Sequence, residues 1–306
     1  MRRIGKRILA AIPVLLGVIL LTFILLRVVP GDPVSVLLGE HYNREMIDRL
    51  TKTMHLDRPV IEQFFYYVLG ALKGDLGVSY TLKRPVTELI VQAFPYTVKL
   101  AVMATLFAWV IGLTAGNIAA VKKDKAPDRI FMAFSLMGVS VPIFMTALIL
   151  QYFFAFRLKW FPLTSDGSWK SLILPAIALG WNSAGSVARL TRSSLVDELQ
   201  ADYIDTARAK GLSKRAVILG HALKNSMLPV ITLMMIQFAS MMSGAVITES
   251  VFSVPGVGRL ATQAVSDRDM PLLQGTILFT TILIIIGNLV ADLLYGVLDP
   301  RIRQGE

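Results

Sequence analysis

Residue types that usually carry out catalysis are few in this sequence, and none stands in a recognisable catalytic pattern. The chain contains no cysteine, which excludes disulfides, thiolate metal sites and thiol catalysis. Only His41, His55 and His221 offer an imidazole, so a histidine-rich metal centre is not expected. Neither the phosphate-binding pattern G-x-x-x-x-G-K-[ST] nor the zinc-protease pattern H-E-x-x-H occurs. We therefore predict a protein that is not an enzyme and binds no metal or cofactor itself. An intramembrane enzyme stays an alternative without support from the sequence.

The most informative spacing lies in the polar stretch 202–229, DYIDTARAKGLSKRAVILGHALKNSMLP. The residues DTA at 205–207 are followed after three residues by Gly211. Small residues allow another surface to approach closely, and a glycine permits the positive φ that a turn between two helices requires. We expect Pro229 to open the next apolar segment. On spacing alone, the stretch is equally compatible with a docking helix and with an amphipathic connector lying on anionic lipid headgroups.

Polar and small residues also recur with helical spacing inside two apolar segments. One set is Asn182, Ser186, Arg189 and Ser193, and the other is Gln237, Ser240, Met241, Gly244 and Thr248. Polar side chains in membrane spans usually face a cavity or the bundle interior, and small residues also permit close helix packing. We favour a translocation path for the second set. For Asn182 and Ser186 packing is the stronger interpretation and the path the weaker one, and Arg189 and Ser193 fall at the cytoplasmic end.

Three further ionisable residues were weighed and set aside. Asp292 lies about two turns before the terminal DPRIR, so we expect an interfacial structural role for it. Glu249 ends an apolar segment and is similarly ambiguous, and His221 is expected to pack or cap locally.

The apolar segments themselves predict an all-α polytopic membrane protein. The chain has 306 residues, of which 54% are hydrophobic and 17% charged. Six runs approach the roughly 20 residues that a bilayer core requires. They are Ile8–Leu26, Tyr96–Val121, Ile130–Phe156, Leu172–Leu190, Leu228–Ser250 and Leu272–Leu298. The fourth is the weakest, because GWNSAGS interrupts it. The first begins after MRRIGKR and lacks a small-residue cleavage site, so we expect a retained span.

The distribution of charge predicts which loops face the cytoplasm. The net charge of +10 is spread over short segments beside the apolar runs, which favours membrane topology over a nucleic-acid-binding surface. The N-terminus, residues 122–129 and residues 188–227 each have an excess of basic residues, whereas residues 30–94 have seven basic and eight acidic ones. We therefore expect both termini inside and 30–94 outside.

The outer segment contains a predicted amphipathic helix in DRPVIEQFFYYVLGALKG, with Asp57 as its N-cap. Its apolar positions repeat with helical spacing at Ile61, Phe64, Phe65, Val68, Leu69 and Leu72. We expect this helix to rest on the membrane domain. It is either a structural cap or a platform for an external partner, and the pattern does not separate these two alternatives.

Several ordered segments resemble a known family, the B-type permease subunits of dipeptide, oligopeptide and nickel ABC importers. They are RVVPGDP at 27–33, GDLGVSY at 74–80, ARLTRSSLVDELQADYIDTARAKGLS at 188–213, HALKNSMLPVIT at 221–232, ESVFSVPGVGRL at 249–260, RDMP at 268–271 and LDPRIR at 298–303. The resemblance covers essentially the whole chain. It implies a type I ABC importer permease fold with six transmembrane helices and an extracytoplasmic lobe between the first and second.

The resemblance also implies a function and a set of partners. A subunit of this kind forms half of a translocation pathway in the bacterial inner membrane, with a homologous C-type permease, two ABC ATPase subunits that use ATP and Mg, and an extracytoplasmic substrate-binding protein. Membrane lipids are the remaining partner, and nucleic acid is not one. The preferred cargo is a di- or oligopeptide. Nickel or a nickel chelate is the first alternative, and a stand-alone secondary transporter is an alternative of a different class.

Within the resemblance, the polar stretch corresponds to the EAA loop, which docks into the ATPase subunit and couples hydrolysis to transport. Asp205, Thr206 and Ala207 occupy the three motif positions, Arg208 follows them, and Gly211 is the motif glycine. The first position departs from the usual glutamate. The spacing from Gly211 to Pro229 is longer than the importer-wide pattern, as in the peptide and nickel group. The implied organisation is 1–29 for the N-terminus and first span, 30–94 for the lobe, 95–298 for the permease core with the coupling loop 200–227, and 299–306 for the cytoplasmic C-terminus.

Overall fold

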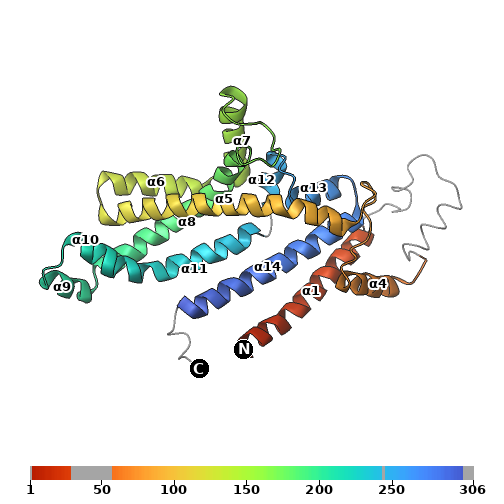
Figure 1. The fold of residues 1–306 in the computed structure, drawn as a ribbon, viewed down its shortest axis with the longest axis horizontal. Helices are drawn as coiled ribbons and strands as arrows, with labels where there is room; N and C mark the ends of the chain where they lie inside the picture. Colours follow the sequence, from red (N-terminus) through yellow and green to blue (C-terminus); the bar gives the residue numbers. More distant parts are fainter. Residues whose placement is uncertain (1, 29–56, 243–244, 299–306) are drawn as a thin grey trace. The chain divides into compact units, whose positions relative to one another are not determined.

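A computed structural model describes residues 2–28, 57–242 and 245–298, and every regular element in these ranges is a helix (Figure 1). The chain folds as two compact units, residues 1–97 with 255–285 and residues 98–254 with 286–306. In chain order the helices are α1 (Arg2–Val28), α4 (Val60–Leu72), α5 (Val86–Val121), α6 (Ala126–Ser140), α7 (Ile143–Leu150), the π-helix η1 (Gln151–Arg157), α8 (Ile173–Leu199), α9 (Asp202–Ala209), α10 (Lys214–Val217), the π-helix η2 (Ile218–Ala222), α11 (Leu223–Met242), α12 (Val246–Val251), α13 (Val257–Ser266) and α14 (Met270–Leu298). The predicted all-α class is therefore confirmed for the described residues.

Helix length and composition identify several of the predicted membrane spans. Among the described residues, Val86–Val121, Lys214–Met242 and Met270–Val290 are long and apolar enough to cross a bilayer. A fourth span results if Ala126–Ser140 and Ile143–Arg157 are counted as one bent element. The chain is thus a polytopic helical membrane protein, and the number of six spans stays a prediction.

The predicted third span, Ile130–Phe156, is not one helix. It breaks between α6 and α7, and the two parts are bent by 106°. Pro142 precedes α7 with extended backbone angles, and Val141 before it is also extended. A proline disfavours a helical conformation in the residue before it, here Val141, and has no backbone N–H to donate. The helix therefore ends at this point.

The fourth and fifth predicted spans also differ from the structure at their ends. Helix α8 continues nine residues beyond the expected Leu190, to Leu199. Helix α11 ends at Met242, and α12 begins at Val246, so the expected run Leu228–Ser250 is interrupted. Pro229 lies inside α11 and does not open it as expected. The apolar composition predicted where a span occurs, but not where its helix ends.

The first unit is organised around a buried carboxylate, Asp269, which none of the site predictions included. Its Oδ2 accepts hydrogen bonds from the Ser79 hydroxyl and from the Thr81 backbone N–H at 3.0 Å. Its Oδ1 accepts from the Leu272 N–H in the first turn of α14 at 3.2 Å. Asp269 is fully buried, and these bonds supply the partners that a buried carboxylate needs. They join the segments GDLGVSY and RDMP, which lie far apart in the sequence.

An apolar core surrounds this junction. Val86, Leu89, Ile90 and Ala93 of α5 pack against Val257 and Ala264 of α13 and Leu272 of α14. The N-terminus of α13 is held to α5, because the Val257 N–H donates to the buried Thr97 hydroxyl at 2.9 Å.

The second unit is built on α8, which packs against α6, α7 and α11. About half of the α8 residues are buried, and many of them are Ala, Gly or Ser. A methyl group at Gly185 would lie 2.4 Å from the Ser135 carbonyl oxygen of α6, and one at Gly116 of α5 would lie 2.6 Å from the Ala188 carbonyl oxygen of α8. Such close approach is characteristic of membrane helices that pack through small residues. The segment GWNSAGS, which weakened the prediction of this span, therefore belongs to the most closely packed helix of the unit.

Candidate functional site

The polar stretch 202–229 folds as the expected pair of helices with a sharp turn between them. Helix α9 ends in a Schellman motif, because the Gly211 N–H donates to the Arg208 carbonyl and the Leu212 N–H donates to the Ala207 carbonyl. Gly211 has a φ of +80°, which confirms the expected positive φ. Ser213 then caps α10, since its hydroxyl accepts the Ala216 N–H at 3.3 Å.

The inner face of this helix pair is a small apolar cluster. Its members are Ala120, Leu195, Val196, Ile204, Ala207, Val217 and Ala222. Ala207 is therefore buried against the chain's own α5 and α8. This corrects the expectation that Ala207 lies on the contact face for another protein. In a helix of only eight residues, the sequence pattern did not define which side faces inward.

The outer face of α9 is polar and exposed. Asp205, Thr206 and Arg208 are all exposed, and the Arg208 guanidinium donates to the Asp205 carboxylate at 2.8 Å. An exposed pair of this kind contributes little to stability. Because both side chains are exposed, their charges remain accessible to a partner. Of the five predicted coupling residues, the structure places Asp205, Thr206, Arg208 and Gly211 on the accessible surface and Ala207 beneath it.

Two polar contacts join the helices around this loop, and the first connects α8 to α6. The Arg192 guanidinium of α8 donates from Nε and Nη2 to the two oxygens of Asp128 on α6, both at 2.6 Å. The hydrogen bonds from Arg192 hold the pKa of the Asp128 carboxyl below its ordinary value, although burial acts in the opposite direction. The Asp124 N–H also donates to Asp128.

The second contact joins the end of α8 to α9 and α11. The Tyr203 hydroxyl of α9 donates to the Glu198 carboxylate of α8, and the Asn225 side chain donates to the Tyr203 oxygen at 3.0 Å. Burial, together with the Glu198 carboxylate, raises the pKa of the Tyr203 hydroxyl. The sequence offered no spacing signal for either contact, because the partners belong to different helices.

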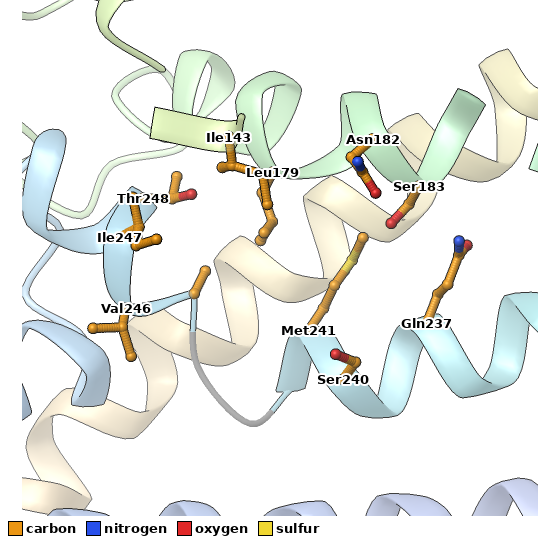
Figure 2. Close-up of a pocket in the computed structure, with 11 residues that line it drawn as sticks. Ile143, Leu179, Asn182, Ser183, Gln237, Ser240, Met241, Val246, Ile247 and Thr248 are labelled. Carbon is orange, nitrogen blue, oxygen red and sulfur yellow. The ribbon is translucent and has the colours of Figure 1, made fainter. Parts of the chain in front are cut away.

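Most of the predicted path residues line one cavity of about 430 Å³. Figure 2 shows Asn182 and Ser183 of α8 facing Gln237 and Met241 of α11 across it, with Thr248 of α12 at one end. The complete lining is Ile143, Leu179, Asn182, Ser183, Gln237, Ser240, Met241, Ala245, Val246, Ile247 and Thr248. The structure therefore brings together Asn182, Gln237, Ser240, Met241 and Thr248 of the predicted set. Ser183 and the apolar lining residues were missed, since they resemble ordinary helix-packing positions.

Among the described residues, two polar atoms of this cavity have no hydrogen-bond partner. They are the Gln237 Oε1 and the Thr248 Oγ1, and Thr248 is only 1% exposed. Asn182, by contrast, donates to the Gly138 and Val139 carbonyls at 3.3 and 3.4 Å, where α6 ends. Buried polar atoms without a partner are costly, so the cavity is suited to a polar occupant such as water or an amide.

The remaining candidates fall outside this cavity or outside the described residues. Ser186 donates to the Asn182 carbonyl within α8. Gly244, His41 and His55 lie outside the described residues, as does the side chain of Asp292. Glu249 is fully buried, and His221 is exposed on η2. Among the described residues, no group of three or more His, Cys, Asp or Glu is arranged to hold a metal ion.

Comparison with known proteins explains this arrangement. Residues 110–304 match the family described as the binding-protein-dependent transport system inner membrane component, and residues 1–101 match its N-terminal region. The chain belongs to this family. It is therefore the permease subunit of an ABC importer, a multi-pass inner-membrane protein whose ATPase activity resides in partner subunits. A permease of this type works with an ATPase, another permease and a binding protein.

Named relatives and solved structures agree with the family. The chain is 40% identical to the glutathione transport system permease protein GsiC of Escherichia coli O6:H1, over 97% of both chains. Identity to GsiC of Escherichia coli K12 is 39%, again over 97% of each. The fold is similar to that of an inward-facing MetNI methionine ABC transporter, with a TM-score of 0.57 and 16% identity over 69% of this chain and 96% of that one. An amino acid ABC transporter crystallised with histidines gives a TM-score of 0.51, 18% identity, and coverage of 68% and 94%.

Proposed function

We propose that this chain forms half of the translocation pathway for di- or oligopeptides, glutathione-like tripeptides included. The observation that carries the proposal is the near full-length similarity to a permease named for glutathione transport. The cavity supports it, because its polar lining consists of amides and hydroxyls and includes no charged side chain. Such groups suit the peptide bond, which offers one donor and one acceptor. Import of nickel or a nickel chelate through the same architecture is the alternative cargo.

In this proposal the chain crosses the membrane six times, with both termini and the loop 200–227 in the cytoplasm and residues 30–94 outside. It pairs with a homologous C-type permease, two ATPase subunits and an extracytoplasmic binding protein. The excess of basic residues in 122–129 and 188–227 supports this orientation.

The exposed face of α9 is the proposed contact with an ATPase subunit. Thr206 lies between the exposed ion-pair residues Asp205 and Arg208, and its side chain packs against no apolar cluster of the chain. Thr206→Trp should therefore block docking sterically while the loop keeps its fold. The measurement is co-purification of the ATPase subunits together with substrate-stimulated ATP hydrolysis. Full docking and full coupling in this variant would remove α9 from the interface.

The cargo is tested with the complete complex in liposomes and its own binding protein. Uptake of labelled dipeptide, glutathione and nickel is measured with ATP supplied on the side of the liposome membrane that carries the ATPase subunits. We expect ATP-dependent uptake of a peptide and no uptake of nickel. Nickel uptake without peptide uptake would replace the proposed cargo with its alternative. Uptake driven by an ion gradient without ATP would indicate a secondary transporter.

The same assay tests the cavity. Ser240→Trp places a large ring beside Met241 and should abolish uptake while the complex still assembles, because the added volume fills the cavity. Val110→Trp is the control, since Val110 is exposed on α5 and lines no described cavity. Normal uptake by an assembled Ser240→Trp complex would show that the cargo does not pass through this cavity.

A further inference from the structure

Helix α4 has an apolar face that the described part of the chain leaves exposed. Ile61, Phe65, Leu69 and Leu72 are spaced at intervals of three or four residues, so they lie on one side of the helix. Their side chains are between 54% and 80% exposed. A protein surface in contact with water rarely presents so many large apolar side chains together.

Residues on other sides of α4 form its hydrogen bond and ring contact with the chain. Gln63 is buried, and its amide donates to the Arg58 carbonyl at 2.7 Å. Phe64 packs edge-to-face on Phe23 of α1, with ring centroids 5.3 Å apart. The helix thus exposes large apolar side chains and buries an amide, unlike a water-exposed amphipathic helix, which buries its apolar residues. The earlier expectation that the apolar face rests on the membrane domain is wrong for these four residues.

The length of α4 excludes a membrane span. Its 13 residues extend about 20 Å, whereas the hydrocarbon core is about 30 Å thick. Charged groups flank its apolar middle, with the Arg58–Glu62 ion pair at one end and the exposed Lys73 at the other. A short, apolar helix with charged ends is typical of a segment that lies along the membrane interface.

The contact with α1 indicates the depth of α4. In the sequence of α1, the uncharged run ends at Leu26 and Arg27 follows, so Arg27 marks the outer end of the apolar segment. Phe23, which contacts Phe64, lies one helical turn, or about 6 Å, before Arg27. That depth corresponds to the boundary between headgroups and acyl chains, where interfacial helices insert by about 5–10 Å.

We propose that α4 is an interfacial helix whose face of Ile61, Phe65, Leu69 and Leu72 is buried in the outer leaflet of the bilayer. The proposal rests on the topology of the proposed function, in which α1 crosses the membrane and 30–94 is outside. Lipid is favoured over a soluble binding protein for two reasons. Charged groups on this side of α4 are confined to its first turn, where Glu62 pairs with Arg58. The neighbouring helix α1, which the proposed topology places across the membrane, also exposes apolar side chains at Leu20, Leu21 and Ile24. Anchored in this way, α4 fixes the height of the outer segment above the bilayer.

Single cysteines test the proposal directly, because the native chain has none. Phe65→Cys and Leu69→Cys report on the outward face, Ala71→Cys on the opposite face, and Lys73→Cys on the charged end. Each full-length variant is labelled with bimane in the assembled importer complex. The complex is reconstituted in phosphatidylethanolamine and phosphatidylglycerol liposomes. Fluorescence is quenched from the lipid by phospholipids brominated near the headgroup end or near the methyl end of the acyl chain, and from water by iodide.

The expected quenching pattern shows whether lipid, water or the binding protein contacts this face of α4. Labels at 65 and 69 should lose most of their fluorescence to the shallow bromines, less to the deep bromines, and little to iodide. The label at 73 should respond to iodide, and the label at 71 should respond weakly to every quencher. Iodide quenching at 65 and 69 equal to that at 73 would overturn the proposal. So would protection from iodide that appears only when the binding protein is added, or stronger quenching by the deep bromines.

The cysteine at position 73 also tests the proposed topology independently of the interfacial helix. If a membrane-impermeant thiol reagent reaches a cysteine at 73 only from the cytoplasmic side, the topology is wrong. If the reagent reaches it from outside and positions 65 and 69 behave as water-exposed, the topology stands and the interfacial helix is wrong.

Discussion

Two short helices outside the long apolar segments, α9 and α4, present opposite faces to their surroundings. In α9 the apolar residues Ile204 and Ala207 point inward, and the ion pair of Asp205 and Arg208 is exposed. In α4 the amide of Gln63 is buried, and large apolar side chains such as Leu69 are exposed. Each belongs to a different compact unit of the chain.

The difference suggests a rule: the residues on the outward face of a short helix indicate whether water or lipid surrounds it. A charged outward face on α9 suits water and a protein partner that associates reversibly. An apolar outward face on α4 suits the lipid contact proposed for it. The sequence patterns of the two helices are both amphipathic, so the pattern alone does not reveal which face is outside. The following predictions change one face at a time.

The largest effect is expected from a charge on the inner face of α9. Ala207→Glu places a carboxylate without a partner into the cluster of Leu195, Val196 and Val217, which should cost about 3–5 kcal/mol and unfold the loop. Thr206→Glu, one residue away on the exposed face, should change stability by less than about 0.5 kcal/mol. The rate of tryptic cleavage within the loop measures both. Equal protease resistance in the two variants would show that α9 does not pack through Ala207.

A smaller loss is expected when the ion pair between α6 and α8 is broken. Asp128→Asn removes the bidentate pairing with Arg192, which is about a quarter exposed, and should cost about 2 kcal/mol. The folded protein holds the pKa of Asp128 below its ordinary value of 3.8. The stabilisation is therefore complete above that value and is lost as the pH falls through the lower, folded-state pKa.

Thermal unfolding of the solubilised complex, measured from neutral pH down to about pH 3, provides the test. The difference in melting temperature between wild type and Asp128→Asn should shrink as the pH decreases. A difference that stays constant with pH would mean that the carboxylate charge does not contribute, and that the loss arises from packing alone.

Glycine substitutions should distinguish the turn between α9 and α10 from the helix that follows it. Gly211→Ala forces a side chain into the positive-φ region and should destabilise the loop by about 1 kcal/mol. Gly220→Ala is the matched control, because Gly220 lies in η2 with open space around it and alanine favours a helix by roughly 0.8–1 kcal/mol. Opposite shifts in melting temperature are expected, and shifts of the same sign would argue against the Schellman turn.

The smallest effect is expected on the outward face of α4. Leu69→Gln weakens insertion into lipid by about 1 kcal/mol or less, which increases opening of α4 by up to about fivefold. Trypsin added outside spheroplasts should then cleave faster at Lys73. Glu62→Gln is the control, since Glu62 is half-exposed in an ion pair and contributes little. Unchanged cleavage in Leu69→Gln would place that side chain in water.

How far the sequence predicted this structure depends on the kind of information that each feature needs. Helical periodicity and apolar length located the long helices, and the glycine at 211 predicted a turn with positive φ. The break before α7 had a local signal in Pro142, which averaging over the apolar run concealed. The inward position of Ala207 had no local signal, because it depends on residues of α5 and α8.

Contacts between distant segments were beyond prediction for a physical reason. Asp128 and Arg192 are 64 residues apart, and Ser79 and Asp269 are 190 residues apart. A single charge or hydroxyl beside an apolar run is compatible with many partners, and only the packing of the helices selects one. For the cavity, helical spacing correctly grouped Gln237, Ser240 and Met241 on one side of α11. On the opposite wall, spacing had also offered Asn182 of α8, whereas Ser183 needed the three-dimensional fold.

The close packing of α8 has a consequence for motion. The helix runs without a break from Asn182 in the cavity wall to Leu199 beside the loop of α9 and α10, a distance of about 26 Å. Its contacts at Gly116 and Gly185 are made by backbone and small side chains, which leave no flexible groups to absorb a displacement. Such a helix behaves as a rigid lever. A tilt of roughly 5° at the loop would move the cavity wall by about 2 Å over that length, enough to change whether a peptide-sized solute fits.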